Sequence, residues 1–280
     1  MKFKIVTTIF FLFFSPLFSS LHLNAHEFWF EPLKFEIKVN DKLMAHEKVG
    51  SNLKGNEYAY LATSYKHFNI TVGDETRPIK SRLGDLPAVN EKIKQDGLVI
   101  LSAVTTPSDL TYKTKTQFET FLDDEGLEWV KKRHKERGLP EDNFKEIYYR
   151  FPKSLVKVGS GKGHDKELGL AFEWVIDTNP YTEQSSTIKA HLLWQGKPFA
   201  NKRVNIFNRV FKDGTNILAN TQLIETHLTT DSFGKIEVPR GEGGLFLISA
   251  VHMIEPSIET SKKTNAVWES LWASISYRIP

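Results

Sequence analysis

The side chains of this sequence best suited to chemistry are its histidines. The chain has 280 residues, nine of them histidine, and it contains no cysteine. Thiolate chemistry is therefore excluded, and a metal site would have to use histidine, carboxylate or methionine side chains or a terminal amine. The chain also lacks a Gly-x-Ser-x-Gly motif, and the acidic run 123–125 has the pattern of a helix end. We do not expect a hydrolase.

His26 is the first candidate ligand because of its place in the chain. Residues 1–25 have the features of a secretory signal peptide: Lys2 and Lys4, a short apolar run and a polar-tending exit that ends at Ala25. Cleavage after Ala25 would make His26 the first residue of the mature protein. Its α-amine and one ring nitrogen could then chelate one metal ion, and such nitrogen ligands suit Cu(II) and Ni(II). An uncleaved anchor, or a frayed first residue, is the alternative.

Two further residues complete the predicted site. Glu27 can add an oxygen ligand, and the aromatic residues 28–30 would hold the terminus against the body of the protein. His252, which closes the apolar segment "LISAVHM", is the predicted second histidine of a T-shaped histidine brace. A histidine packed in the core explains the same position equally well. Weaker candidates are the pairs His46–Glu47 and Glu225–His227, the second of which would share one strand face.

Charge and composition exclude several other functions. The formal net charge is +3, and removal of Lys2 and Lys4 with the signal peptide leaves only +1. The chain has no block rich in lysine and arginine, so a nucleic-acid partner is not expected. The segment "GSGKGH" lacks the spacing of a phosphate-binding loop and is interpreted as a surface loop. No segment after residue 25 has an apolar run long enough to span a membrane.

The elements that must position these residues are mainly strands. Short apolar-polar alternations bounded by Gly, Pro, Asn and Asp predict a mainly β protein made of two antiparallel β-sandwich domains. We expect the first sandwich at 26–114 and the second at 165–280. Between them, 115–164 is predicted to be a helical insert and connector, with helix stops at Gly126 and Gly138 and a further helix over 140–151.

Several segments resemble one known family when they are taken in order. They are "HEFWFEP", "FETFLDDEGL", "EIYYRFPKSLVKVG", "LAFEWVIDTNPY", "GKPFANKRVNIFNR", "TTDSFGKIEVP", "LISAVHM" and "WESLWASISY". Together they resemble an exported bacterial family of unknown function that includes soluble periplasmic components of nickel-uptake systems. The resemblance implies a C-terminal module like transthyretin or the carboxypeptidase regulatory domain. It also implies a role in periplasmic metal handling and a histidine at the position of His252.

Three functions follow from these observations. The first is a periplasmic metal-binding protein, not an enzyme, that delivers or buffers nickel, cobalt or copper for a membrane transporter. The second is a copper redox enzyme that uses the same histidine brace, and the third is a metal-free β-sandwich interaction module. In the first two, replacing His252 with alanine is expected to weaken metal binding by removing one nitrogen ligand.

The first testable prediction concerns the mature terminus. Intact-mass measurement on the exported protein is expected to give a chain that starts at His26, because the signal features end at Ala25. A chain that starts at Leu21, or a chain that keeps residues 1–25, would lack the amine ligand and would contradict the histidine chelate.

Overall fold

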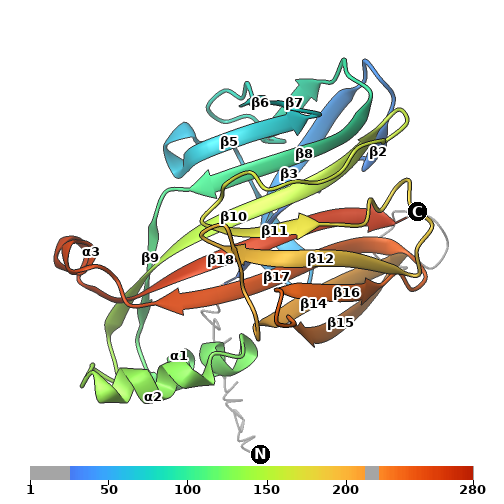
Figure 1. Ribbon diagram of the computed structural model, residues 1–280. Helices are drawn as coiled ribbons and strands as arrows, with labels where there is room; N and C mark the ends of the chain where they lie inside the picture. Colours follow the sequence, from blue (N-terminus) through green and yellow to red (C-terminus); the bar gives the residue numbers. More distant parts are fainter. Residues whose placement is uncertain (1–25, 212–220, 280) are drawn as a thin grey trace, which may run out of the picture.

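The computed structural model describes residues 26–211 and 221–279, so the predicted signal peptide lies outside the described residues. Within these ranges the chain forms three β-sheets, three short α-helices and one 3₁₀ turn at Ala62–Ser64 (Figure 1). The described part of the chain contains no helix that is long and apolar enough to cross a membrane. The prediction of a mainly β protein built from β-sandwiches is confirmed.

The largest sheet runs through the whole molecule. Its strands, in spatial order, are β15 (Thr221–Thr229), β14 (Arg203–Phe211), β17 (Gly244–Ile254), β18 (Ala266–Ile279), β10 (Phe144–Val158), β8 (Gly97–Thr105), β5 (Tyr65–Val72) and β6 (Glu75–Pro78). Two short strands, β2 (Glu36–Ile37) and β9 (Ser108–Tyr112), also pair with β10. Strands β10 and β18 run parallel, and their pairing joins the N-terminal and C-terminal parts of this sheet.

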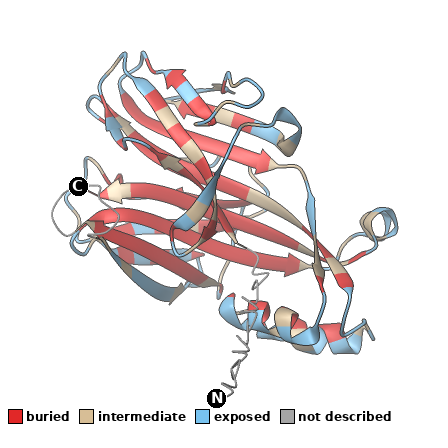
Figure 2. Cartoon of the chain, turned by 180° about the vertical axis from the view of Figure 1, so that it is seen from behind, coloured by how far each residue is buried: buried red, intermediate tan, exposed pale blue. Residues whose placement is uncertain are grey.

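Two smaller sheets cover opposite faces of the large sheet. The first contains β1 (Glu27–Pro32), β3 (Lys42–Ser51), β4 (Lys54–Tyr58) and β7 (Val89–Lys92). The second contains β11 (Phe172–Ile176), β12 (Thr187–Trp194), β13 (Lys197–Pro198) and β16 (Lys235–Pro239). Along β8, Val99 and Leu101 pack in the core under the first small sheet, whereas Leu98 and Ile100 pack in the core under the second. The two sandwiches therefore share one sheet, whose central strands, such as β8 and β17, are buried on both faces (Figure 2).

The predicted helical segment is only partly helical. Helices α1 (Lys115–Asp124) and α2 (Glu128–Glu136) form as expected, and Gly126 and Gly138 both adopt positive φ angles where the helices end. The expected helix over 140–151 is wrong, because Phe144–Val158 is strand β10. Its aromatic and β-branched side chains pair with β9 on one side and β18 on the other, and this pairing outweighs the helix signal of the preceding residues. The third helix, α3 (Ile258–Thr264), lies between β17 and β18.

A buried ion cluster fastens the second small sheet to β10. The Lys153 side chain is fully buried, and its Nζ lies 2.8 Å from Asp165 Oδ1 and 3.1 Å from Glu173 Oε1. The same ammonium donates to the backbone carbonyl of Trp174 at 2.9 Å. Because no solvent reaches this cluster, each charge depends on the others for its stabilisation.

Replacement of Lys153 is therefore expected to destabilise the fold strongly. Lys153→Met keeps the length of the side chain but leaves two buried carboxylates without their cation, and it should lower the free energy of unfolding by about 3–5 kcal/mol. The matched control is Lys157→Met on the same strand, whose partner Glu36 is exposed; its cost should stay below about 1 kcal/mol. Urea denaturation followed by circular dichroism measures both. Equal, small losses would contradict a structural role for the buried cluster.

Candidate metal site at the start of strand β1

The start of β1 is held firmly against the large sheet. Phe28 is almost fully buried, and Trp29 and Phe30 are completely buried. Two serines of β18 donate hydrogen bonds to this strand: Ser274 Oγ to the Phe28 carbonyl at 2.5 Å and Ser276 Oγ to the Phe30 carbonyl at 2.6 Å. The aromatic anchor expected from the sequence is thus present, and it fixes the backbone that leads to His26.

His26 has a defined position at the end of this strand. Its Nδ1 lies 3.0 Å from Ser51 Oγ, and its carbonyl accepts a hydrogen bond of 3.1 Å from Arg150 Nη2. Burial, with the nearby Arg150 guanidinium as the smaller cause, lowers the pKa of the His26 imidazole below its usual range. The ring is therefore neutral near pH 7, which is the form that binds metals.

Next to His26 lies a polar cavity of about 280 Å³, which we call the N-terminal cavity. It is lined by Glu27, Ser51, Asn52, Phe121, Asp124, Glu125, Arg203, Asn205, Phe207, Glu225 and His227. The lining comes from β1, the turn after β3, the end of α1, β14 and β15. Four of these residues are acidic and only one is a permanent cation, so the cavity favours positively charged ligands.

Glu27 is the most unusual residue of the cavity. Its side chain is only 6% exposed, and no other residue of the described chain donates a hydrogen bond to it or forms a salt bridge with it. Burial raises the pKa of Glu27 to about 7, and the negative charge of Glu225 adds to the rise, although the residue's own backbone N–H and Arg150 oppose it. A carboxyl group in this state gains stability if a cation binds beside it.

Glu125 reinforces the same charge imbalance. Its pKa is raised to about 8, first by burial and then by the nearby Glu27, while Lys202 and Arg203 act in the opposite direction. Glu125 Oε2 accepts a hydrogen bond of 2.9 Å from Asn205 Nδ2. Two buried carboxyl groups from distant parts of the chain therefore disfavour each other's ionisation.

The hydrogen bonds around Asn205 fix the state of His227. Because the Asn205 amide nitrogen donates to Glu125, its oxygen must be the acceptor for His227 Nδ1, which lies 3.0 Å away. His227 Nδ1 is then the donor of this hydrogen bond, and Nε2 makes no hydrogen bond in the described part of the chain. That Nε2 lies 3.7 Å from Glu225 Oε1, as the predicted shared strand face requires. His227 Nε2 is thus available to bind a metal.

His252 is not part of this cavity. It lies on the face of β17 that is covered by the second small sheet, where its ring packs against Trp194, Phe199 and Phe172. Leu245 and Leu247, which point the other way on the same strand, pack with Trp29. Hence the large sheet separates His252 from His26, and the structure does not bring the two predicted brace ligands together. Burial, with Lys202 as the second cause, lowers the pKa of His252 to about 4.

The side chains of His46 and Glu47 also lie on opposite sides of a sheet, because neighbouring residues of strand β3 point to opposite faces. His46 Nδ1 lies 3.4 Å from Glu57 Oε2, whereas Glu47 is buried on the other face and accepts a hydrogen bond of 2.6 Å from the Tyr65 hydroxyl.

Within residues 26–211 and 221–279, no three His, Cys, Asp or Glu side chains already converge as a metal site. The His26 nitrogen is an amide in the full-length chain, so a terminal chelate would arise only after cleavage.

The sequence matches the family described as "Domain of unknown function (DUF4198)" over residues 23–254. The chain belongs to this family. A comparison with curated proteins finds no match. The match of the DUF4198 domain begins just before His26 and ends two residues after His252, so it spans β1, the N-terminal cavity and both predicted histidines.

Among the cavity residues that the sequence did not point to, Glu125 and Asn205 matter most, because they are hydrogen-bonded to each other inside it. Glu125 follows Asp123 and Asp124 at a helix end, and three acids in a row there resemble ordinary solvated residues. Only Glu125 of the three is buried. Gly126 could have indicated the burial of Glu125, because a glycine directly after it, with a φ of +63°, allows the chain to turn at this point.

The raised pKa of Glu27 makes a prediction about stability in the absence of metal. Because the folded chain holds the Glu27 proton up to about pH 7 and the unfolded chain releases it near 4.5, stability should fall as pH rises through this range. Glu27→Gln removes this loss and should be more stable than the natural chain by up to about 3 kcal/mol at pH 8, but not at pH 4. Urea denaturation at both pH values, with the exposed Glu242→Gln as control, measures this. A difference that does not change with pH would contradict the assignment.

Proposed function

We propose that the processed protein binds one divalent transition-metal ion, nickel, cobalt or copper, at the N-terminal cavity. In this proposal it is a periplasmic binder without turnover that buffers the ion or delivers it to a membrane transporter. The observation that carries the proposal is the Glu27 carboxyl group, which is buried and faces a cavity with three further acidic side chains. No other residue in the described ranges pairs with it through a hydrogen bond or salt bridge.

The charge of the cavity supports a cation as its ligand. Glu27 and Glu125 stay partly protonated near neutral pH because each is buried and each lies near another carboxyl group, Glu225 for Glu27 and Glu27 for Glu125. A metal ion would replace those protons and neutralise both carboxylates, so its binding is coupled to proton release.

The donor set supports a transition metal in particular. After cleavage the His26 amine and imidazole form a chelate, Glu27 adds a carboxylate, and His227 Nε2 offers a second imidazole nitrogen from β15. In this arrangement His227 takes the place that the sequence assigned to His252. Nitrogen-rich ligand sets favour nickel and copper over magnesium or calcium.

The resemblance found in the sequence supports two finer parts of the proposal. Similarity to periplasmic components of nickel-uptake systems favours nickel as the cargo. The proposal that 165–280 form a transthyretin-like module is supported by the packing of one small sheet on the large one. Strands β11, β12, β13 and β16 of the small sheet pack on β14, β17 and β18.

Calorimetric titration of protein that begins at His26 tests the proposal. We expect one site for Ni(II) or Cu(II), and one added residue before His26 should abolish it by turning the amine into an amide. His227→Ala should weaken binding, whereas His252→Ala should now leave affinity unchanged, since His252 lies across the large sheet. Affinity should fall as pH drops, because the amine, with a usual pKa of about 7.7–8.0, must lose its proton.

The metal affinities of the extended protein and of the two histidine variants can also contradict the proposed site. Equal affinity in the mature and extended proteins would remove His26 from the site. If His252→Ala lowered the metal affinity as much as His227→Ala, either a change on one face of the large sheet would alter the site on the other face, or the metal would bind elsewhere. Circular dichroism of each variant separates lost ligands from lost structure.

A further inference from the structure

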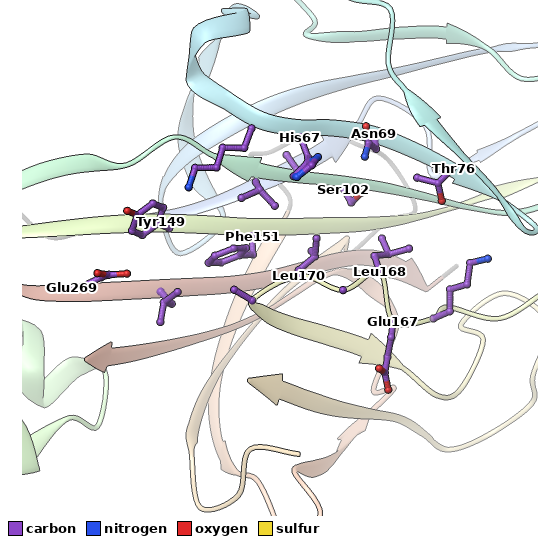
Figure 3. A pocket seen from close by; sticks show the side chains of 17 residues that line it. His67, Asn69, Thr76, Ser102, Tyr149, Phe151, Glu167, Leu168, Leu170 and Glu269 are labelled. Atoms are coloured by element: carbon purple, nitrogen blue, oxygen red, sulfur yellow. The ribbon is translucent and has the colours of Figure 1, made fainter. Parts of the chain in front are cut away.

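A larger cavity lies on the other face of the large sheet, away from the N-terminal cavity. It is a groove of about 760 Å³ between β5 and β8 on one side and the segment 166–171 on the other, which we call the sheet groove (Figure 3). Its volume is in the range of small-molecule and peptide sites. Its lining combines apolar side chains, chiefly Phe151, Leu168, Leu170 and Leu271, with a row of polar ones.

The wall formed by 166–171 is held in place. Glu173 accepts hydrogen bonds from the backbone nitrogens of Leu168, at 2.8 Å, and Leu170, at 3.0 Å. Glu173 is in turn held by the buried Lys153 ammonium. The wall has no regular secondary structure, yet its position is set by a fully buried charge cluster. The groove is therefore preformed, which lowers the entropic cost of binding.

The opposite wall presents polar groups that have no partner. Asn69 on β5 and Ser102 on β8 are direct neighbours in the antiparallel ladder and both line the groove. Ser102 is only 4% exposed. Neither side chain makes a hydrogen bond to another residue in the described parts of the chain. Asn69 is half-buried and both side chains face the groove, so their polar groups are accessible to a ligand that donates and accepts hydrogen bonds. An asparagine amide matches a peptide group, which also offers one donor and one acceptor.

One end of the groove has the features of an ammonium site. There the Tyr149 ring lies next to Glu269 (Figure 3), a half-buried carboxyl group that forms no salt bridge within the described residues. The ammonium of the exposed Lys66 already lies 4.8 Å from the centre of the Tyr149 ring. An aromatic face beside a carboxylate is a favourable place for a cation, and Lys66 occupies it from within the chain.

We propose that the sheet groove binds a short peptide with a free amino terminus and apolar side chains. The terminal ammonium displaces Lys66 from the Tyr149 ring and pairs with Glu269, and a backbone amide bonds with Asn69 and Ser102. The apolar side chains pack against Leu168 and Leu170. This site is independent of the proposed metal site, because the large sheet separates the two.

Affinity selection from a random tetrapeptide library, read by mass spectrometry, tests the proposal on the full mature protein. We expect the protein to enrich apolar tetrapeptides with free amino termini and not the same library after N-acetylation. Asn69→Leu should abolish enrichment, whereas Asn90→Leu, an exposed asparagine on β7, should not. No enrichment from the free library, or equal enrichment from the acetylated one, would overturn the proposal.

The enriched peptides then allow the charged end to be measured by calorimetry. Glu269→Gln should weaken binding about tenfold or more, because it removes a charge-assisted hydrogen bond, and the exposed Glu242→Gln is its control. Lys66→Ala should strengthen binding about two- to fivefold, because it frees the Tyr149 ring for the ligand. Weaker binding in Lys66→Ala would show that Lys66 attracts an anionic group instead, and would overturn the assignment of an ammonium site.

Discussion

Strand β10 is the element on which the rest of the structure depends. Its parallel pairing with β18 joins two sandwiches into one continuous sheet, and its alternating side chains serve both faces. Arg150 points to one face and donates to the carbonyl of His26. Tyr149 and Lys153 point to the other face, where Tyr149 lines the sheet groove and Lys153 holds its wall through Glu173. One strand thus positions His26 and the groove on opposite sides of the molecule.

Buried charged residues have different surroundings on the two faces of the large sheet. Around Lys153 one buried ammonium forms salt bridges with both Asp165 and Glu173, and the cluster serves the fold. Around Glu27 no cation forms a salt bridge within the described residues, and the charges of Glu225 on Glu27 and of Glu27 on Glu125 both raise a carboxyl pKa. Buried carboxyl groups without a cationic partner are stabilised when a bound cation neutralises their charge. For this reason we place the proposed function at the N-terminal cavity and regard Lys153 as structural.

Several features were predictable from the sequence, and the reasons for the others are physical. The aromatic residues after His26 predicted an anchored first strand, and Gly126 and Gly138 predicted the ends of the two helices. The shared face of Glu225 and His227 followed from strand alternation. The role of His252 could not be derived, because "GLFLISAVHM" is buried on both faces and its pattern does not show which way a side chain points. The first part of β10, residues 144–151, was predicted as a helix because its pairing partners, β9 and β18, are distant in the sequence and leave no local signal.

The central claim is that cleavage before His26 creates a metal site at the N-terminal cavity. Anomalous diffraction from crystals of the processed protein, collected at the nickel or copper absorption edge, tests it most directly. We expect one strong peak within bonding distance of the His26 amine and ring nitrogens and on the side of Glu27. A peak beside His252, or none near His26 in fully loaded crystals, would contradict it.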